Sequence, residues 1–361
     1  MFPSMERLPT GVIVDIPCEW VGSLRSASNF WMTGVALGNG SIVPTTMDQL
    51  DPQLGRIVNN LETTIIGKRS LMEFMVTAVL AQGHVLIDDV PGVGKTTVAT
   101  TLARSLGLTH RRIQCTPDLL PTDITGVTIF HPGTRQFEFH PGPVFANLVI
   151  ADEINRTSPR TQSALLEVME EGQVTVDGVT HPLQPPFLVV ATQNPIEYDG
   201  TFPLPESQLD RFLFRLNVGY PSVEEESNIL SQSDETRSPE SVQAVITLPE
   251  LLERMQAVKR VHVSDTIRDY IARIAETTRS SPRIELGMSP RASLALYRAA
   301  QAWALLHSRA YVVPDDVLTL APFVVEHRLI LSRTSGTPTV HLVDDVFKGL
   351  LQTVPIPPLV Q

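Results

Sequence analysis

One glycine-rich segment has the residue types and the spacing that bind phosphate groups. Gly92-Val-Gly-Lys-Thr96 follows an apolar run at residues 84–87 and precedes a helix-like run at residues 98–106. A loop between a strand and a helix directs backbone N–H groups and the amino end of the helix toward a bound phosphate. Lys95 would contact the β- and γ-phosphates, and the Thr96 hydroxyl would bind Mg²⁺. The positions predicted to contact the nucleotide are Asp89, Val90, Pro91, Gly92, Val93, Gly94, Lys95, Thr96 and Thr97.

This match to a phosphate loop is incomplete, but a second motif supports it. The full pattern G-x-x-x-x-G-K-[ST] requires glycine at position 89, where the chain has Asp89, and an ordinary glycine turn before a capped helix is the alternative. Further along, an apolar strand at residues 148–151 ends in Asp152 and Glu153. Asp152 would hold Mg²⁺, and Glu153 would polarise the attacking water as general base. An Asp-Glu pair usually lies in a solvated loop, but its position after a buried strand favours the catalytic role.

Strands and helices alternate around these motifs. Strand-like runs also occur at residues 187–191 and 213–218, and helical periods cover residues 54–61 and 68–81. A helix starts at Ser158-Pro159, a capping residue followed by proline, and ends at Glu171-Gly172. This alternation predicts an α/β fold with a parallel sheet and helices on both faces.

The chain divides into four predicted segments. Residues 1–46 have no period and are expected to form a flexible N-terminal extension. Residues 47–231 form the α/β domain, with a β-hairpin inserted near residues 124–143. The polar residues 232–241 are predicted to be a linker. Residues 242–361 have only helical periods and are predicted to form a small all-helical domain.

Composition excludes several classes of protein. The 361 residues are 42% hydrophobic, which is too apolar for a disordered chain. The net charge of 28 − 39 = −11 argues against a general nucleic-acid-binding surface. Two cysteines make no disulfide scaffold and suit a reducing compartment, so we expect a cytoplasmic protein. We find neither an apolar run of membrane-spanning length nor a signal peptide.

Six motifs in this order make the chain resemble the MoxR-type AAA+ ATPases, from about Met47 to the C-terminus. They are residues 88–96 (DDVPGVGKT), 139–156 (FHPGPVFANLVIADEINR), 162–171 (QSALLEVMEE), 191–195 (ATQNP), 204–212 (LPESQLDRF) and 289–291 (SPR). The resemblance implies a three-layer αβα P-loop domain, a helical lid, and homo-oligomeric rings, usually hexamers, with ATP and Mg²⁺ bound between subunits. The family loop commonly lacks the first glycine, which removes the objection raised by Asp89.

The resemblance also implies roles for individual residues. Asn194 matches the first sensor, which orients the attacking water; Asn194-Pro195 could equally be a turn. Arg211 matches the arginine finger that reaches the γ-phosphate of the neighbouring subunit; an ion pair with Asp210 or Glu206 is the alternative. Arg291 matches the second sensor. Independently, Ser289-Pro290 indicates the start of a helix, so the alternative is an exposed arginine in a capped helix. A weaker match puts Ile66 and Gly67 at the adenine.

Two questions stay open at this level. Arg156 and Arg160 could serve the neighbouring site, or could only pair with Glu153 or Glu167. The leading function is an ATPase that remodels, matures or inserts metals into partner proteins, including proteins with von Willebrand factor A domains, through a hairpin directed at the ring pore. The alternatives are a nucleic-acid motor of the related helicase type and a nucleotide-gated binding module with little turnover.

Removal of residues 1–46 is expected to leave nucleotide affinity and melting temperature nearly unchanged, because this segment has no period and lies outside the resemblance. Nucleotide titration and thermal unfolding of the shortened chain measure both quantities. A large loss of either would show that the segment belongs to the fold.

Overall fold

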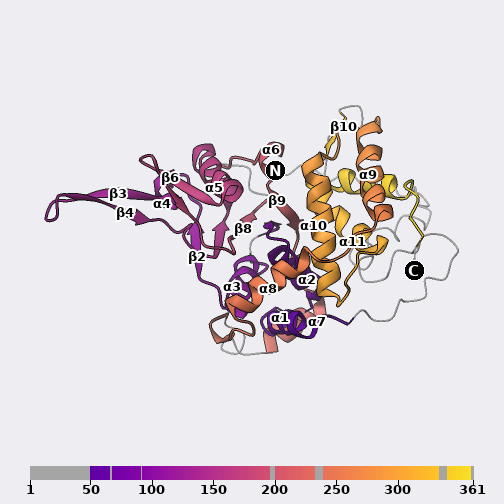
Figure 1. Ribbon diagram of the computed structural model, residues 1–361, viewed down its shortest axis with the longest axis horizontal. Coiled ribbons are helices and arrows are strands. Elements are labelled where there is room, and N and C mark those ends of the chain that lie inside the picture. Colours follow the sequence, from indigo (N-terminus) through magenta and orange to yellow (C-terminus); the bar gives the residue numbers. More distant parts are fainter. Residues whose placement is uncertain are drawn as a thin grey trace, which may run out of the picture. The chain divides into compact units, whose positions relative to one another are not determined.

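Figure 1 shows the computed structural model, which describes residues 49–65, 67–90, 92–195, 200–231, 239–332 and 340–358. Its α/β part is built on a five-stranded sheet in the order β2-β5-β8-β1-β9. Every neighbouring pair in this sheet is parallel. The strands are β1 (His84–Asp88), β2 (His110–Gln114), β5 (Leu148–Asp152), β8 (Leu188–Gln193) and β9 (Phe212–Leu216).

Side chains alternate between the two faces of this sheet and so create two cores. In β1, Val85 and Ile87 join the core that also contains α1 (Pro52–Glu62), α2 (Arg69–Leu80) and α3 (Lys95–Ser105). Leu86 belongs to the other core, with α4 (Pro121–Thr125) and α5 (Pro159–Glu171). Helices therefore cover both faces of a parallel sheet, and the predicted three-layer αβα fold is confirmed.

Two helices begin where the sequence predicts. The Ser158 hydroxyl accepts a hydrogen bond from the Thr161 N–H at the start of α5. Ser289 does the same for Ala292 at the start of α10 (Pro290–Leu306). In both helices a proline fills the first position, where no hydrogen-bonded N–H is needed. Arg291 is consequently fixed in the first turn of α10.

Two antiparallel hairpins extend from the α/β part. The predicted insertion forms β3 (Gly126–His131) and β4 (Gln136–Pro141), which project away from the sheet (Figure 1). The second hairpin pairs β6 (Gln173–Val176) with β7 (Val179–Pro182) through Asp177-Gly178, both at positive φ. The Phe139 and His181 rings stack with centroids 4.0 Å apart, so the two hairpins touch.

The C-terminal part is mainly helical. It contains α8 (Leu248–Val258), α9 (Asp265–Ser280), α10, α11 (Pro314–Val325) and α12 (Val340–Leu351). The all-helical prediction requires one correction, because β10 (Ile284–Leu286) and β11 (Ile330–Leu331) form a short antiparallel pair. The Phe74 ring of α2 stacks on Trp303 of α10 at 5.2 Å, so this part shares a core with the α/β part.

Some predicted segments lie outside the described residues, and some elements of the structure were not predicted from the sequence. Residues 1–46 and most of the predicted linker lie outside the described residues, and the domain boundaries stay predictions. Sequence periodicity missed β2, whose residues are mostly polar and exposed because it is an edge strand. It also missed the short helices α4 and α6 (Glu206–Leu209) and the terminal helix α12. The run Glu224-Glu225-Glu226 does begin a helix, α7 (Val223–Ser231), as its acidic residues indicate.

No helix within the described ranges is both long enough and apolar enough to cross a membrane.

His84 links the sheet to α5 at the first residue of β1. Its Nδ1 accepts a hydrogen bond from the Val189 N–H at 3.0 Å, so its Nε2 carries the proton and donates to the Met169 carbonyl, also at 3.0 Å. Burial lowers the pKa of this imidazole from 6.5 to about 4. The folded chain therefore holds His84 neutral in a pH range where the unfolded chain protonates it.

Acidification should therefore lower the free energy of unfolding through His84. Between pH 6.5 and 4 the unfolded state binds a proton that the folded state does not, so stability falls as pH falls through this window. Between pH 7 and 5 the His84 contribution amounts to about 2 kcal/mol. Urea unfolding of the wild type and of His84→Gln at both pH values tests this. The variant should lose less stability on acidification, and an equal loss in both proteins would contradict the assignment.

Candidate nucleotide site

The carboxyl ends of β1, β5 and β8 bring most of the predicted site residues together. Parallel pairing sets Asp88 beside Gln193 and Ala151 beside Ala191, so the three strands end at one edge of the sheet. The phosphate loop follows β1, the two carboxylates end β5, and Asn194 follows β8. A crevice at the carboxyl ends of parallel strands is the usual ligand position in such sheets.

The phosphate loop has the backbone conformation of an anion-binding turn. Gly92 and Gly94 adopt φ of +86° and +87°, a region that glycine enters without steric cost. Lys95 begins α3, and its Nζ lies 2.5 Å from the Asp89 carbonyl and 2.9 Å from the Gln193 carbonyl. Burial lowers the Lys95 pKa, while the carboxylates of Asp89 and Asp88 act in the opposite direction.

The donor set beside the loop suits Mg²⁺. The Thr96 hydroxyl lies 3.0 and 3.2 Å from the two Asp152 carboxylate oxygens, and Asp152 is buried. Hydroxyl and carboxylate oxygens are the hard ligands that Mg²⁺ prefers. Thr192 donates to the same carboxylate at 3.3 Å, and Arg112 Nε contacts it at 2.5 Å. Thr96 and Asp152 thus fit the predicted metal role, with Arg112 supplying positive charge at the site.

Glu153 is held in a strained and well-anchored position. Its φ of +57° lies in the left-handed region, which a residue with a side chain enters at a cost, and such strain collects at functional sites. Its N–H donates to the Thr192 hydroxyl at 3.0 Å. Its carboxylate accepts hydrogen bonds from Gln114 Nε2 at 3.1 Å and from Arg156 Nη1 at 3.3 Å. Arg156 therefore makes the ion pair with Glu153 that one of the two interpretations expected.

Two residues of this group escaped the sequence analysis. Arg112 and Gln114 both belong to β2, two positions apart, and Arg112 Nη2 donates to Gln114 Oε1 at 3.1 Å. Their side chains share one face of the strand because strand residues alternate. The spacing of Arg112 and Gln114 places them on one face only when His110–Gln114 is known to be a strand, and the sequence alone does not indicate a strand here.

The structure describes most of the other residues that were predicted to contact the nucleotide or the attacking water. Asn194 is buried, and its carbonyl accepts a hydrogen bond from Asn155 Nδ2 at 3.2 Å. Gly67 has a φ of +76°, and a Cβ there would overlap the Glu225 carboxylate of α7. Val90, Val93 and Thr97 lie in the loop or the first turn of α3, while Ile66 and Pro91 lie outside the described residues.

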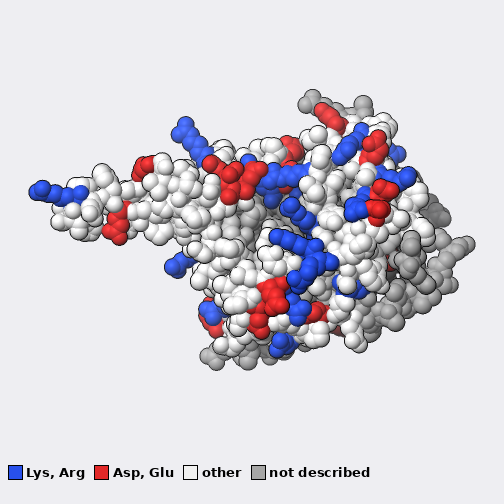
Figure 2. Space-filling view, in the orientation of Figure 1, with Lys and Arg blue, Asp and Glu red and all other residues white. Residues whose placement is uncertain are grey.

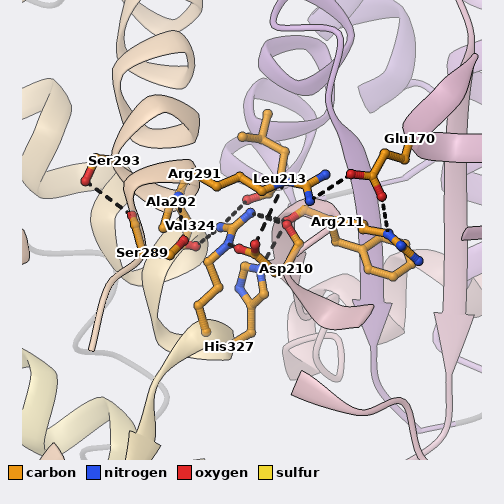
Figure 3. A network of polar contacts seen from close by, with 12 residues as sticks. Glu170, Asp210, Arg211, Leu213, Ser289, Arg291, Ala292, Ser293, Val324 and His327 are labelled. Carbon is orange, nitrogen blue, oxygen red and sulfur yellow. Dashed lines mark hydrogen bonds and ion pairs between the residues drawn. The ribbon is translucent and has the colours of Figure 1, made fainter. Parts of the chain in front are cut away.

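Arg211 and Arg291 lie at the opposite edge of the sheet. Arg211 precedes β9, whose first residue, Phe212, pairs with His84 at the start of β1. The phosphate loop follows the other end of β1, and a five-residue strand spans roughly 16 Å at about 3.3 Å per residue. Figure 3 shows that Arg211 and Arg291 meet at Glu170. The structure therefore does not bring these two arginines to the phosphate loop of their own chain.

The ion pairs at this edge differ from those considered from sequence. Arg211 Nε contacts Glu170 Oε2 at 2.9 Å, whereas Asp210 is bound by Arg328 Nε at 2.6 Å. Arg328 is buried and also donates to the Phe212 carbonyl at 2.7 Å. Sequence analysis missed Arg328 and Glu170, because their importance comes from contacts between segments about 120 and 40 residues apart.

The chain is similar to ATPases over most of its length. Residues 84–214 match the "ATPase family associated with various cellular activities (AAA)", and residues 276–346 match the "AAA lid domain". The uncharacterized protein YeaC of Bacillus subtilis is 53% identical over 284 residues, which cover 79% of this chain and 89% of YeaC. Chaperone MoxR1 of Mycobacterium tuberculosis is 42% identical over 313 residues, 84% of this chain and 82% of MoxR1. A crystal structure of a candidate ATPase from Cytophaga hutchinsonii aligns with a TM-score of 0.76 at 33% identity, covering 85% of this chain and 95% of that one.

Substitutions of Lys95 and Glu153 should have different effects on nucleotide. Lys95→Ala removes the cation beside the phosphate loop and is expected to abolish ATP binding. Glu153→Gln removes the general base and should keep ATP bound while slowing hydrolysis by roughly 10²–10⁴-fold. Binding of a fluorescent ATP analogue and release of phosphate separate the two effects.

The exposed Lys259, at the end of α8, supplies a matched control for the loss of a lysine. Lys259→Ala should bind and hydrolyse ATP normally. Normal hydrolysis by Glu153→Gln would show that Glu153 is not the base.

Proposed function

Because the chain belongs to the MoxR-type family of AAA+ ATPases, we propose that it hydrolyses ATP at the interfaces between identical subunits of a ring, expected to be a hexamer. In this proposal one subunit supplies Lys95, Thr96, Asp152, Glu153 and Asn194. The neighbouring subunit supplies Arg211 and Arg291. The free energy of hydrolysis would drive the remodelling of partner proteins.

The observation that carries this proposal is the separation of these two groups by the length of β1. Glu153 and the phosphate loop lie where β1 and β5 end, which we call the carboxyl edge of the sheet. Arg211 adjoins the first residues of β1 and β9, which we call the amino edge. A guanidinium acts on a phosphoryl group only in direct contact with its oxygens. One chain alone therefore has no complete site, and a second copy that turns its amino edge to the first would complete it.

The residues at the carboxyl edge have distinct roles in this mechanism. The Lys95 ammonium binds the β- and γ-phosphate oxygens in exchange for the Asp89 and Gln193 carbonyls that it now contacts. Thr96 and Asp152 would hold Mg²⁺, which would neutralise charge on the phosphate oxygens. Asn194 orients the attacking water, and the Glu153 carboxylate accepts its proton. Gln114 and Arg156 both contact Glu153 Oε2, so these two contacts leave Oε1 for the proton of the water.

The β3–β4 hairpin supports a protein client. Its outer part exposes Ile129, Phe130 and Phe137, and the two phenylalanine rings lie 5.2 Å apart across the strands. Figure 2 shows few charged side chains along this hairpin. An exposed apolar surface fits a polypeptide better than a phosphate backbone, which requires arginine and lysine. We therefore assign the hairpin to clients or partners, such as proteins with von Willebrand factor A domains whose maturation or metal insertion the ATPase assists.

Two inactive variants should restore activity when they are mixed. Arg211→Ala removes a group worth roughly 10³–10⁵ in rate for known arginine fingers, but should still bind ATP. Glu153→Gln is inactive because of a defect at the other edge. In mixed rings some interfaces combine an intact Glu153 with an intact Arg211 from the next subunit, so phosphate release should rise at intermediate mixing ratios.

Subunit exchange is monitored independently with fluorescently labelled chains. When exchange is complete, flat activity across all mixing ratios would rule out the action of Arg211 across an interface.

A further inference from the structure

We propose that Glu170 is a positioning residue that fixes Arg211 and Arg291 as one paired phosphate-binding group. The inference rests on the proposed function, in which both arginines act on the nucleotide of a neighbouring subunit. It adds a carboxylate that touches no nucleotide itself and that acts through two guanidinium groups.

The atoms used in these contacts leave the phosphate-binding atoms available. Glu170 Oε2 accepts from Arg211 Nε at 2.9 Å, and Oε1 accepts from Arg291 Nη1 at 3.2 Å. Within the described residues, Arg211 Nη1 and Nη2 and Arg291 Nη2 form no hydrogen bond or ion pair. A guanidinium has five N–H donors in a planar fork, so a carboxylate bound at Nε fixes the plane while the terminal nitrogens stay free. Glu170 therefore orients Arg211 without blocking it.

The balance of charge explains why a carboxylate is needed between the arginines. Arg211, Arg291 and Arg328 are three cations around Glu170 and Asp210. Figure 2 shows acidic and basic groups side by side between α5 and α10, where this cluster lies. Like charges repel, so without Glu170 the two flexible arginine side chains would move apart into solvent. With Glu170 the cluster keeps one excess positive charge, which attracts an anionic phosphate.

Glu170 is itself anchored by the surrounding backbone. It lies in the last turn of α5, and the carbonyl of the preceding residue, Met169, is bound by the buried His84. On the other side, Arg328 holds Asp210, which precedes Arg211, and Ser289 caps the helix that carries Arg291. Three segments far apart in sequence are thus fixed at one point (Figure 3).

The experiment compares Glu170→Gln with Glu171→Gln, a change to the adjacent exposed carboxylate, which forms no ion pair with any described residue. Glu170→Gln should bind ATP as the wild type does, because the carboxyl edge is intact. Its kcat should fall by about 10²-fold, the usual effect of displacing a reacting group by roughly 1 Å. Glu171→Gln should retain wild-type kcat. Glu170→Asp, which keeps the charge with a shorter reach, should fall between wild type and Glu170→Gln.

Mixing identifies the edge on which Glu170 acts. Glu170→Gln should regain activity when mixed with Glu153→Gln, because their defects lie on different sides of an interface. It should regain none with Arg211→Ala, because both defects lie on the same side. A purely structural ion pair between α5 and α10 does not predict this pattern.

Several results would overturn the proposal for Glu170. These are wild-type kcat in Glu170→Gln, recovery with Arg211→Ala, or no recovery with either partner. Failure of the pair Glu153→Gln and Arg211→Ala to recover is a different outcome, because it contradicts the proposed interface itself.

Discussion

Parallel pairing of the strands is the constraint on which the rest of this structure depends. It sends the carboxyl ends of β1, β5 and β8 to one edge of the sheet and leaves the amino end of β9 at the other. The phosphate loop follows β1, Asp152 ends β5, Asn194 follows β8 and Arg211 precedes β9, so the topology decides which of these residues meet. The phosphate loop, Asp152, Glu153 and Asn194 share one edge, and Arg211 shares the other with Glu170. A closed ring is the simplest assembly in which identical chains complete each other's sites, because a head-to-tail contact joins unlike edges.

Buried charges at both edges are stabilised by specific partners. The Asp152 carboxylate accepts hydrogen bonds from Thr96, Thr192 and Arg112 at the carboxyl edge. At the amino edge the buried Arg328 binds Asp210 and a carbonyl of β9. Removal of one partner of a buried pair leaves an uncompensated charge, which costs far more than the loss of a surface ion pair. The buried Asp152 and Arg328 are therefore held in place by these partners.

Polar contacts join the C-terminal part to the amino edge. His327 and Arg328 both contact the Phe212 carbonyl, and Arg291 enters the same cluster from α10. The shared apolar core, with Phe74 against Trp303, connects α10 to α2. The position of the helical part and the position of Arg211 are thus set by the same contacts. The helical part is therefore connected directly to Arg211, which the proposed function places beside the nucleotide of a neighbouring subunit.

Sequence alone determined the local features of this protein. Apolar periods located the strands β1, β5, β8 and β9 to within two residues, and Ser-Pro pairs located the starts of α5 and α10. These features were predictable because neighbouring residues create them: a strand run, a helix cap and a glycine turn each depend on a few adjacent positions. The position of Asp152 and Glu153 after an apolar strand connected them to the phosphate loop. The resemblance to a family then added roles for Asn194, Arg211 and Arg291.

Only the tertiary structure decided which side chains meet. Arg112 and Gln114 lie on an edge strand without an apolar run, so their contacts with Asp152 and Glu153 had no local signal. Glu170 meets residues 41 and 121 positions away, and no period in the sequence encodes such a meeting. The separation of Arg211 from the phosphate loop of its own chain likewise follows from the parallel pairing of β1 with β9. Long-range contacts of this kind depend on how the whole sheet and its covering helices pack, which no short segment specifies.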